Sequence, residues 1–159
     1  MDKQKFIDLI RNQLEADLSV LKSAALATYD AATNEESKPE NQYDTRALEA
    51  SYLAGAQAKR VADIEELIYI YKNVQIKNFK PTEAIAVTAL LELKTAGKNI
   101  FVFVMPKGGG QSLQIQGMTV QIVTPNSPLG EALLGLFVGD VAQIENGDKV
   151  RDYEILSLQ

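Results

Sequence analysis

The feature that most constrains this chain is a polar, acidic segment that separates two long stretches with helical periodicity. The segment, NEESKPENQYD at residues 34–44, contains four carboxylates, one lysine and no aliphatic residue. Each flanking stretch runs for about 30 residues without a proline, which would break a helix. A short connection between two amphipathic helices favours antiparallel neighbours. Residues 1–76 are therefore predicted to form an antiparallel coiled-coil hairpin whose acidic tip is residues 34–44.

The apolar residues of both stretches recur mainly at steps of three and four, the spacing of one helical face. In the first stretch, Lys3 to about Ala32, the predicted stripe consists of Phe6, Ile10, Leu14, Leu18, Leu21 and Ala25. In the second, Tyr43 to about Val74, it consists of Leu48, Tyr52, Leu53, Ala56, Ile64, Leu67, Ile68 and Tyr71. At about 1.5 Å per residue, each arm would be roughly 45 Å long.

After a linker at residues 77–83, the sequence predicts a second, α+β domain at residues 84–159. Segments rich in β-branched and aromatic residues predict strands at 84–93, 99–105, 119–124, 138–145 and 149–158. Asn-Gly at 146–147 predicts a tight hairpin, and the glycines at 108–110 predict a turn rather than a phosphate cradle. A short helix is predicted after Ser127, with Pro128 at its first position and Gly135 just past its end. The expected domain is a small antiparallel sheet covered by one helix.

Composition excludes several kinds of chemistry. The chain has no cysteine and no histidine, so disulfides and self-sufficient Ser-His-Asp, Cys-His or HExxH sites are excluded. The start lacks an apolar signal region, and no apolar run approaches the roughly 20 residues that span a bilayer, so a cytoplasmic location is expected. A net charge of -5 argues against nonspecific binding to nucleic acid, which needs clustered lysine and arginine.

Three segments resemble one family. The run TPNSPLGEALLGLFVGD at residues 124–140, followed by VAQIENGDKVRDYEILSLQ, closely resembles the C-terminal end of the bacterial transcript-cleavage factors GreA and GreB. The segment AGAQAKRVADIEELI, residues 54–68, is similar to the second coil helix of these factors. Glu40-Asn41-Gln42-Tyr43 resembles their Glu-Asn-Ala-Glu-Tyr motif just after the tip. In order and spacing, the chain resembles a divergent Gre-like member.

The resemblance implies both a fold and a role. Gre factors join an N-terminal antiparallel coiled coil to a C-terminal domain of FKBP-like topology. That domain docks on RNA polymerase at the rim of its secondary channel, and the coil inserts so that its tip reaches the polymerase active site, close to the RNA 3' end. The implied role is a transcription elongation regulator: an accessory factor rather than an enzyme, with no cofactor of its own. The Mg2+ would belong to the polymerase active site, and a monomer is favoured.

Particular residues carry this implication. The resemblance implies that Glu40, which takes the place of the family's glutamate, and Glu36, next to the position of the family's aspartate, are the tip carboxylates that would help to hold the shared Mg2+ and stimulate RNA cleavage. The residues implied in partner binding are Asn41, Tyr43, Asp44, Ser127 and Pro128. The cleavage-competent pattern has an aspartate three positions before the glutamate, and Ser37 stands there in this chain. Two activities therefore stay open: stimulation of cleavage, and non-cleaving regulation from the same channel.

The same residues also allow simpler interpretations. Ser37 and Glu40 fit a capping box for the second helix, and Glu35 and Glu36 fit a solvated turn. A structural coiled-coil adaptor would use the hairpin to dimerise.

A prolyl isomerase or chaperone of FKBP type is a further alternative. It would need an aromatic-lined pocket on the C-terminal sheet. The aromatic side chains available, Phe101, Phe103, Phe137 and Tyr153, are expected to pack in the core of the sheet instead.

Overall fold

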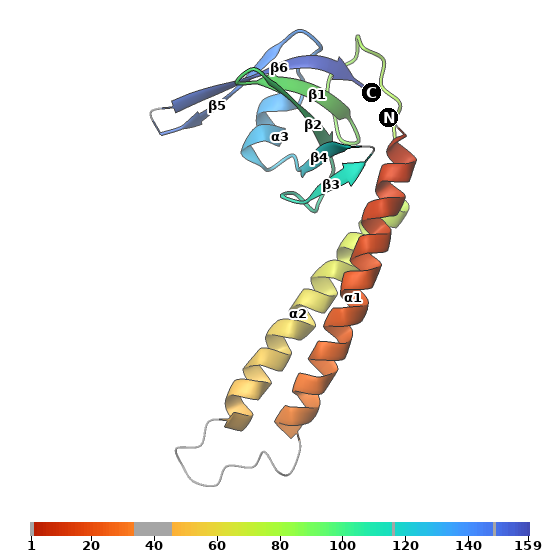
Figure 1. Ribbon diagram of the computed structural model, residues 1–159, viewed down its shortest axis with the longest axis vertical. Helices are drawn as coiled ribbons and strands as arrows, with labels where there is room; N and C mark the ends of the chain where they lie inside the picture. The colour runs from red at the N-terminus through yellow and green to blue at the C-terminus, as the bar shows by residue number, and fades with distance from the viewer. Residues whose placement is uncertain (1, 34–45, 116, 148) are drawn as a thin grey trace. The chain divides into compact units, whose positions relative to one another are not determined.

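The structure, a computed structural model, describes residues 2–33, 46–115, 117–147 and 149–159. It divides into two compact units (Figure 1). A helical unit comprises Ile7–Asn73. The second unit, called here the β unit, comprises Val74–Gln159 together with Met1–Phe6. No helix in the part of the chain that the structure describes is long and apolar enough to cross a membrane.

The helical unit is the predicted hairpin. Its helices are α1 (Lys3–Thr33) and α2 (Arg46–Asn73), which lie side by side and antiparallel in Figure 1. On α1 the less exposed residues follow a spacing of four and three, at Leu14, Leu18, Leu21, Ala25 and Thr28. On α2 they do the same, at Ala54, Gln57, Val61, Ile64 and Ile68. This alternation is the seam of a coiled coil. Beside the seam, an ion pair joins Lys22 Nζ to Glu65 Oε1 at 2.7 Å.

The apolar stripe predicted for the first half of α2 is wrong. Leu48, Tyr52 and Leu53 are exposed, with 53–73% of their surface accessible. The three-four spacing that begins at Ile68 and Ile64 continues back through Val61 and Gln57 to Ala54, so the three larger residues fall outside the seam. The seam near the tip is instead made of small residues, which allow two helix backbones to approach closely.

The β unit contains a six-stranded sheet and one short helix among the described residues. The strands are β1 (Leu90–Thr95), β2 (Lys98–Val104), β3 (Ser112–Ile115), β4 (Met118–Val123), β5 (Val141–Asn146) and β6 (Lys149–Leu158). The helix α3 spans Pro128–Leu133. The strands lie in the order β3-β4-β2-β1-β6-β5.

The α+β class is confirmed, but the sheet is mixed. Strands β1 and β2, β1 and β6, β3 and β4, and β5 and β6 pair antiparallel as expected. Strands β2 and β4 pair in parallel, with Phe101 opposite Val120. The extra strand β3 accounts for this arrangement, because the chain crosses to the edge of the sheet at β3 before it returns at β4. Four residues are too few to give a clear alternation in the sequence.

The first strand begins later than predicted, at Leu90 instead of residue 84. Upstream of it, Ile85 uses its backbone elsewhere: its N–H donates to Leu136 O, and its carbonyl accepts from Gly135 N, both at 2.9 Å. The chain then bends at Thr88, whose φ is 73°. Ile85 therefore pairs with the segment that follows α3, Thr88 and Ala89 form hydrogen bonds with Val104, and the first strand begins after them at Leu90.

The Asn-Gly turn closes a hairpin as predicted, and a second tight turn joins β1 to β2. Asn146 pairs with Lys149 across the β5–β6 turn, and Thr95 pairs with Lys98 across the β1–β2 turn. In the second turn Ala96 and Gly97 both have positive φ, 47° and 75°. This combination is typical of the type I′ turn, whose twist matches that of the flanking strands.

The core of the β unit lies on one face of the sheet. It contains Leu91 and Leu93 from β1, Val102 and Val104 from β2, and Leu133 from α3. On the opposite face, Phe103 makes an edge-to-face contact with Phe6, with ring centroids 5.2 Å apart and an interplanar angle of 80°.

The aromatic side chains divide between core and surface. Tyr153 is buried in the core as expected, and Phe103 is buried on the opposite face, but Phe137 is 46% exposed, because it lies in the loop after α3 rather than on a strand. Phe101 and Tyr153 line two different cavities. These four side chains therefore do not form the single aromatic pocket that an isomerase would need.

Candidate functional site

Most of the residues that the sequence singles out belong to the tip. Glu36, Glu40, Asn41, Tyr43 and Asp44 lie outside the described residues, as does the possible capping box formed by Ser37 and Glu40. Of the predicted partner-binding residues, Ser127 and Pro128 are described. Within the described ranges, no group of three or more Asp, Glu, His or Cys side chains is placed to hold a metal ion.

Ser127 caps the helix α3, as the sequence predicts. Its backbone is extended, and its Oγ accepts a hydrogen bond from Gly130 N at 3.1 Å. The same hydroxyl donates to Thr124 O at 2.7 Å. Pro128 occupies the first helical position, where its missing N–H costs nothing. The hydroxyl of Ser127 is therefore committed to the local fold, whereas the ring of Pro128 is exposed.

Gly130 explains why this turn is so tight. A Cβ added at this position would stand 1.9 Å from Thr124 O and 2.7 Å from the carbonyl carbon. Only glycine permits such a close approach of the helix to the preceding backbone. Thr124, Ser127, Pro128 and Gly130 thus each have a steric or hydrogen-bonding role in this turn.

A shallow groove of about 510 Å³ lies beside this cap. The triglycine segment Gly108–Gly110 borders it with Lys107, and the other residues lining it are Gln121, Ile122, Val123, Thr124, Ser127, Pro128 and Leu129. A Cβ on Gly109 would approach Thr124 Cγ2 to 3.1 Å, so this side of the groove packs closely. Among these lining residues the only charged side chain is that of Lys107.

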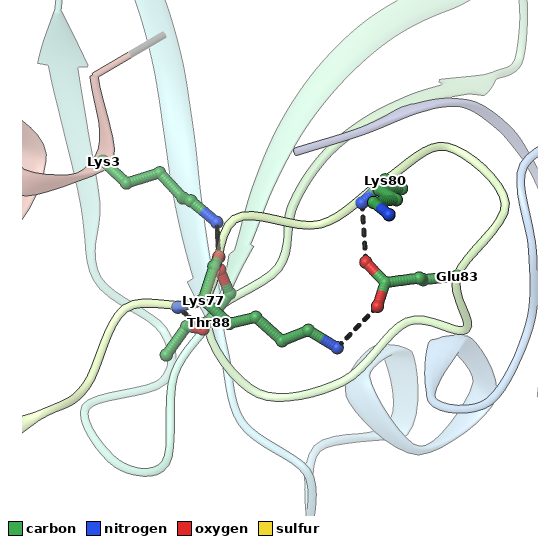
Figure 2. Close-up of polar contacts among 5 residues, drawn as sticks. All are labelled: Lys3, Lys77, Lys80, Glu83 and Thr88. Atoms are coloured by element: carbon green, nitrogen blue, oxygen red, sulfur yellow. Dashed lines mark hydrogen bonds and ion pairs between the residues drawn. The ribbon is translucent and has the colours of Figure 1, made fainter.

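A cluster of polar side chains holds residues 77–88, the segment that leads from α2 to the sheet (Figure 2). All of its residues belong to the β unit. Lys3 Nζ donates to the main-chain oxygen of Lys77 and, at 3.0 Å, to that of Thr88. Lys77 N in turn donates to Thr88 Oγ1 at 3.0 Å. Lys3 is only 6% exposed, and burial lowers its pKa to about 8.

Glu83 completes this arrangement, as Figure 2 shows. Its Oε2 accepts a hydrogen bond from Lys80 N at 2.7 Å, and its Oε1 pairs with Lys77 Nζ at 2.9 Å. The Lys80 backbone hydrogen bond, and then the Lys77 side chain, lower the pKa of the Glu83 carboxyl. Nearby, Lys3 Nζ and Lys77 Nζ lie 5.1 and 4.7 Å from the centre of the Phe79 ring. This cluster is structural, because its polar groups bond one another.

Several large apolar side chains of the hairpin face outward, which was not predicted from the sequence. Besides Leu48, Tyr52 and Leu53, the side chains of Leu26 and Tyr29 on α1 are 63% and 58% exposed. The heptad spacing of the sequence indicates this outward position. Counted back from Ile64 and Ile68, it places none of the three α2 residues in the seam.

The described residues therefore define a protein that carries an antiparallel helical hairpin and a mixed-sheet α+β unit with a groove beside its one short helix. No family model matches the sequence. No curated protein matches it either.

Among solved structures, the chain is similar to GreA factor homolog 1 (Gfh1) of Thermus thermophilus, with 20% identity over 94% of both chains and a TM-score of 0.38. It is similar to Thermus aquaticus Gfh1, with 17% identity over 93% of this chain and 92% of that one, and a TM-score of 0.38. It is also similar to the prokaryotic transcription elongation factor GreA/GreB from Nitrosomonas europaea, with 16% identity, coverage of 60% and 78%, and a TM-score of 0.36.

Proposed function

We propose that this chain is a transcription elongation regulator that binds RNA polymerase, with the β unit docking on the enzyme and the hairpin entering its secondary channel. The observation that carries the proposal concerns the C-terminal part of the β unit. The residues that most closely resemble the C-terminal end of GreA and GreB, 124–159, contain the capped helix α3 and the β5–β6 hairpin. The groove beside Pro128 is then the docking surface that we propose for the β unit.

The hairpin has the properties that channel entry requires. Its arms are 31 and 28 residues long, which at about 1.5 Å per residue gives a reach of roughly 40 Å. Toward the tip its seam consists of the small residues Ala25 and Thr28 on α1 and Ala54 on α2, which lets the two helix backbones approach closely. Ion pairing of Lys22 with Glu65 helps to fix the register of the two arms.

Two forms of the proposal differ in what the tip does. In the cleaving form, Glu36 and Glu40 act as oxygen ligands to the Mg2+ of the polymerase active site, a type of ligand that Mg2+ prefers. In the non-cleaving form the hairpin occupies the channel and changes elongation or pausing. Ser37 in place of the family's aspartate favours the second form.

The decisive experiment adds the purified chain to backtracked elongation complexes that carry RNA labelled at its 3' end, in the presence of Mg2+. Binding is measured separately, by the fluorescence anisotropy of labelled chain. Short 3' fragments that disappear with Glu36→Ala and Glu40→Ala, but persist with Asp63→Ala on α2, would support the cleaving form. Binding without fragments would support the non-cleaving form. No binding to polymerase would refute the proposal.

The docking surface has its own test. Pro128→Ala combined with Lys107→Glu should weaken polymerase binding at least tenfold, while far-ultraviolet circular dichroism and the unfolding temperature of the β unit stay close to those of the unaltered chain. Unchanged affinity in this double variant would exclude the groove as the docking surface.

A further inference from the structure

A second cavity opens on the sheet face opposite the core. Its volume is about 230 Å³, and it is lined by Leu90, Leu91, Glu92, Phe101, Met118, Ser157 and Gln159. Phe101 alternates along β2 with the core residue Val102, so it belongs to the outer face. A volume below the roughly 300 Å³ of typical small-molecule pockets is the size of one large side chain.

An irregularity in the sheet shapes this cavity. The register between β1 and β6 shifts between Glu92 and Leu93: Leu93 pairs with Ile155, but Glu92 pairs with Ser157. Leu156 is the extra residue of a β-bulge, a feature that re-aims side chains and occurs often beside binding sites. As a result, Ser157 lies next to Glu92 on the outer face, since paired residues share a face.

The lining combines apolar walls with one oriented carboxylate. Leu90, Phe101 and Met118 supply the walls. Glu92 Oε1 accepts a hydrogen bond from Asn99 Nδ2 at 2.8 Å, which orients the carboxylate while its other oxygen can accept from a ligand. A long cationic side chain matches this combination: its methylene groups pack on the apolar walls, and its charged head pairs with the carboxylate.

Charge on the surrounding face points to the same class of partner. The registers place Glu154 opposite Lys94, Asp152 opposite Gln143, and Glu145 opposite Val150, all of them exposed and on the outer face. Gln143 Nε2 donates to Asp152 Oδ1 at 3.0 Å and holds it in place. With Glu92, the outer face of β1, β6 and β5 thus carries four carboxylates and one lysine.

We propose that this outer face docks a basic segment of a partner protein, with an arginine side chain inserted into the cavity against Glu92. An extended segment of about six residues spans roughly 20 Å, enough to pass from the cavity toward Asp152. The carboxylates would repel nucleic-acid phosphates. Two such faces, on a chain of net charge -5, would also repel each other, which disfavours a second copy as the occupant. The proposal does not depend on polymerase binding.

The test uses the full chain labelled with 15N and a synthetic peptide, acetyl-AKALRAKA-amide. Titration should cause saturable NMR shifts at the amides of Glu92, Phe101 and Ser157. Glu92→Gln should weaken binding at least fivefold, whereas the matched control Glu131→Gln on α3 should leave it unchanged. A peptide with citrulline, the neutral analogue of arginine, in place of its arginine should bind the unaltered chain at least tenfold more weakly. This comparison does not depend on whether a substituted chain folds.

Four results would overturn the proposal. The peptide could shift only residues of the acidic tip, or shift none at millimolar concentration. The citrulline and arginine peptides could bind equally well. If the shifts at the cavity depended only on the concentration of the chain, without peptide, the occupant of the cavity would be a second copy of the chain rather than a basic partner.

Discussion

Lys3 Nζ donates a hydrogen bond to the main-chain oxygen of Thr88 at 3.0 Å, across 85 residues of sequence. The same amine also donates to the oxygen of Lys77. It is a buried lysine whose two hydrogen-bond partners are neutral carbonyl oxygens, and the Phe79 ring lies 5.1 Å away, so burial disfavours its charged form. A neutral amine keeps two N–H donors, one for each carbonyl, and is cheaper to bury.

The stability of the β unit should therefore rise with pH above neutrality through Lys3. Its pKa is about 8 when folded and 10.5 as the unperturbed value. Between these values the unfolded chain binds more protons, so the free energy of unfolding increases as pH rises, and below about pH 8 the full cost of the buried charge is present. Urea unfolding at pH 7 and pH 9.5 should show a gain of about 1–2 kcal/mol relative to Lys3→Met. A difference between the two chains that does not change with pH would contradict this assignment.

Gly130→Ala should destabilise the β unit by about 1–3 kcal/mol, because the new methyl group would overlap Thr124 O. Gly55→Ala on α2 is the matched control: nothing lies within 4 Å of a Cβ there, and alanine should stabilise the helix by about 1 kcal/mol. Denaturant unfolding followed by circular dichroism compares the two. Equal effects of the two substitutions would rule out the close approach at Gly130.

Gln57→Leu should stabilise the hairpin by about 1 kcal/mol. Gln57 occupies a seam position, and its Oε1 is buried without a hydrogen bond from any residue that the structure describes. Replacing an unsatisfied polar group in a coiled-coil seam by an apolar one removes the desolvation cost. Thermal unfolding monitored at 222 nm measures the change, with Gln13→Leu, an exposed position on α1, as the control. A lower unfolding temperature for Gln57→Leu would show that the amide is satisfied in solution.

Ala96→Gly should stabilise the β1–β2 hairpin by about 0.5–1 kcal/mol. Ala96 has a φ of 47°, a conformation that costs a residue with a Cβ about 1 kcal/mol. The type I′ turn favours glycine or asparagine there, so Ala96→Asn should act in the same direction. Gly97→Ala, at a φ of 75°, should have the opposite sign. Urea midpoints of the three variants give the comparison.

Local signals in the sequence were enough for much of this fold. The bounds of α1, the cap of α3 by Ser127 and the Asn-Gly hairpin follow from periodicity and turn chemistry, which act over a few residues. The strand β3 and the late start of β1 at Leu90 do not, because both depend on backbone pairing with distant segments, such as that of Ile85 with Leu136.

The candidate site was predictable to a smaller extent. Ser127 and Pro128 were found as cap residues, but the groove beside them depends on the return of Gly108–Gly110 to Thr124, which no local pattern indicates. The cavity at Phe101 depends on a register shift of one residue between β1 and β6. The outward position of Leu48 and Tyr52 could not be predicted in the same way. Either the face that carries them or the face that carries Ala54 and Gln57 could form the seam, and the choice depends on packing against α1.

The position of β6 inside the sheet, between β1 and β5, affects the order in which the chain folds during synthesis. The hairpin of α1 and α2 can form as soon as residue 73 has left the ribosome. The sheet cannot be completed until residue 158 has emerged, since β1 and β5 both need β6 as their neighbour. Phe6 must likewise wait for Phe103. The nascent chain therefore carries a finished helical arm while the apolar strands behind it are still exposed, and this is the interval in which a chaperone would have most to cover.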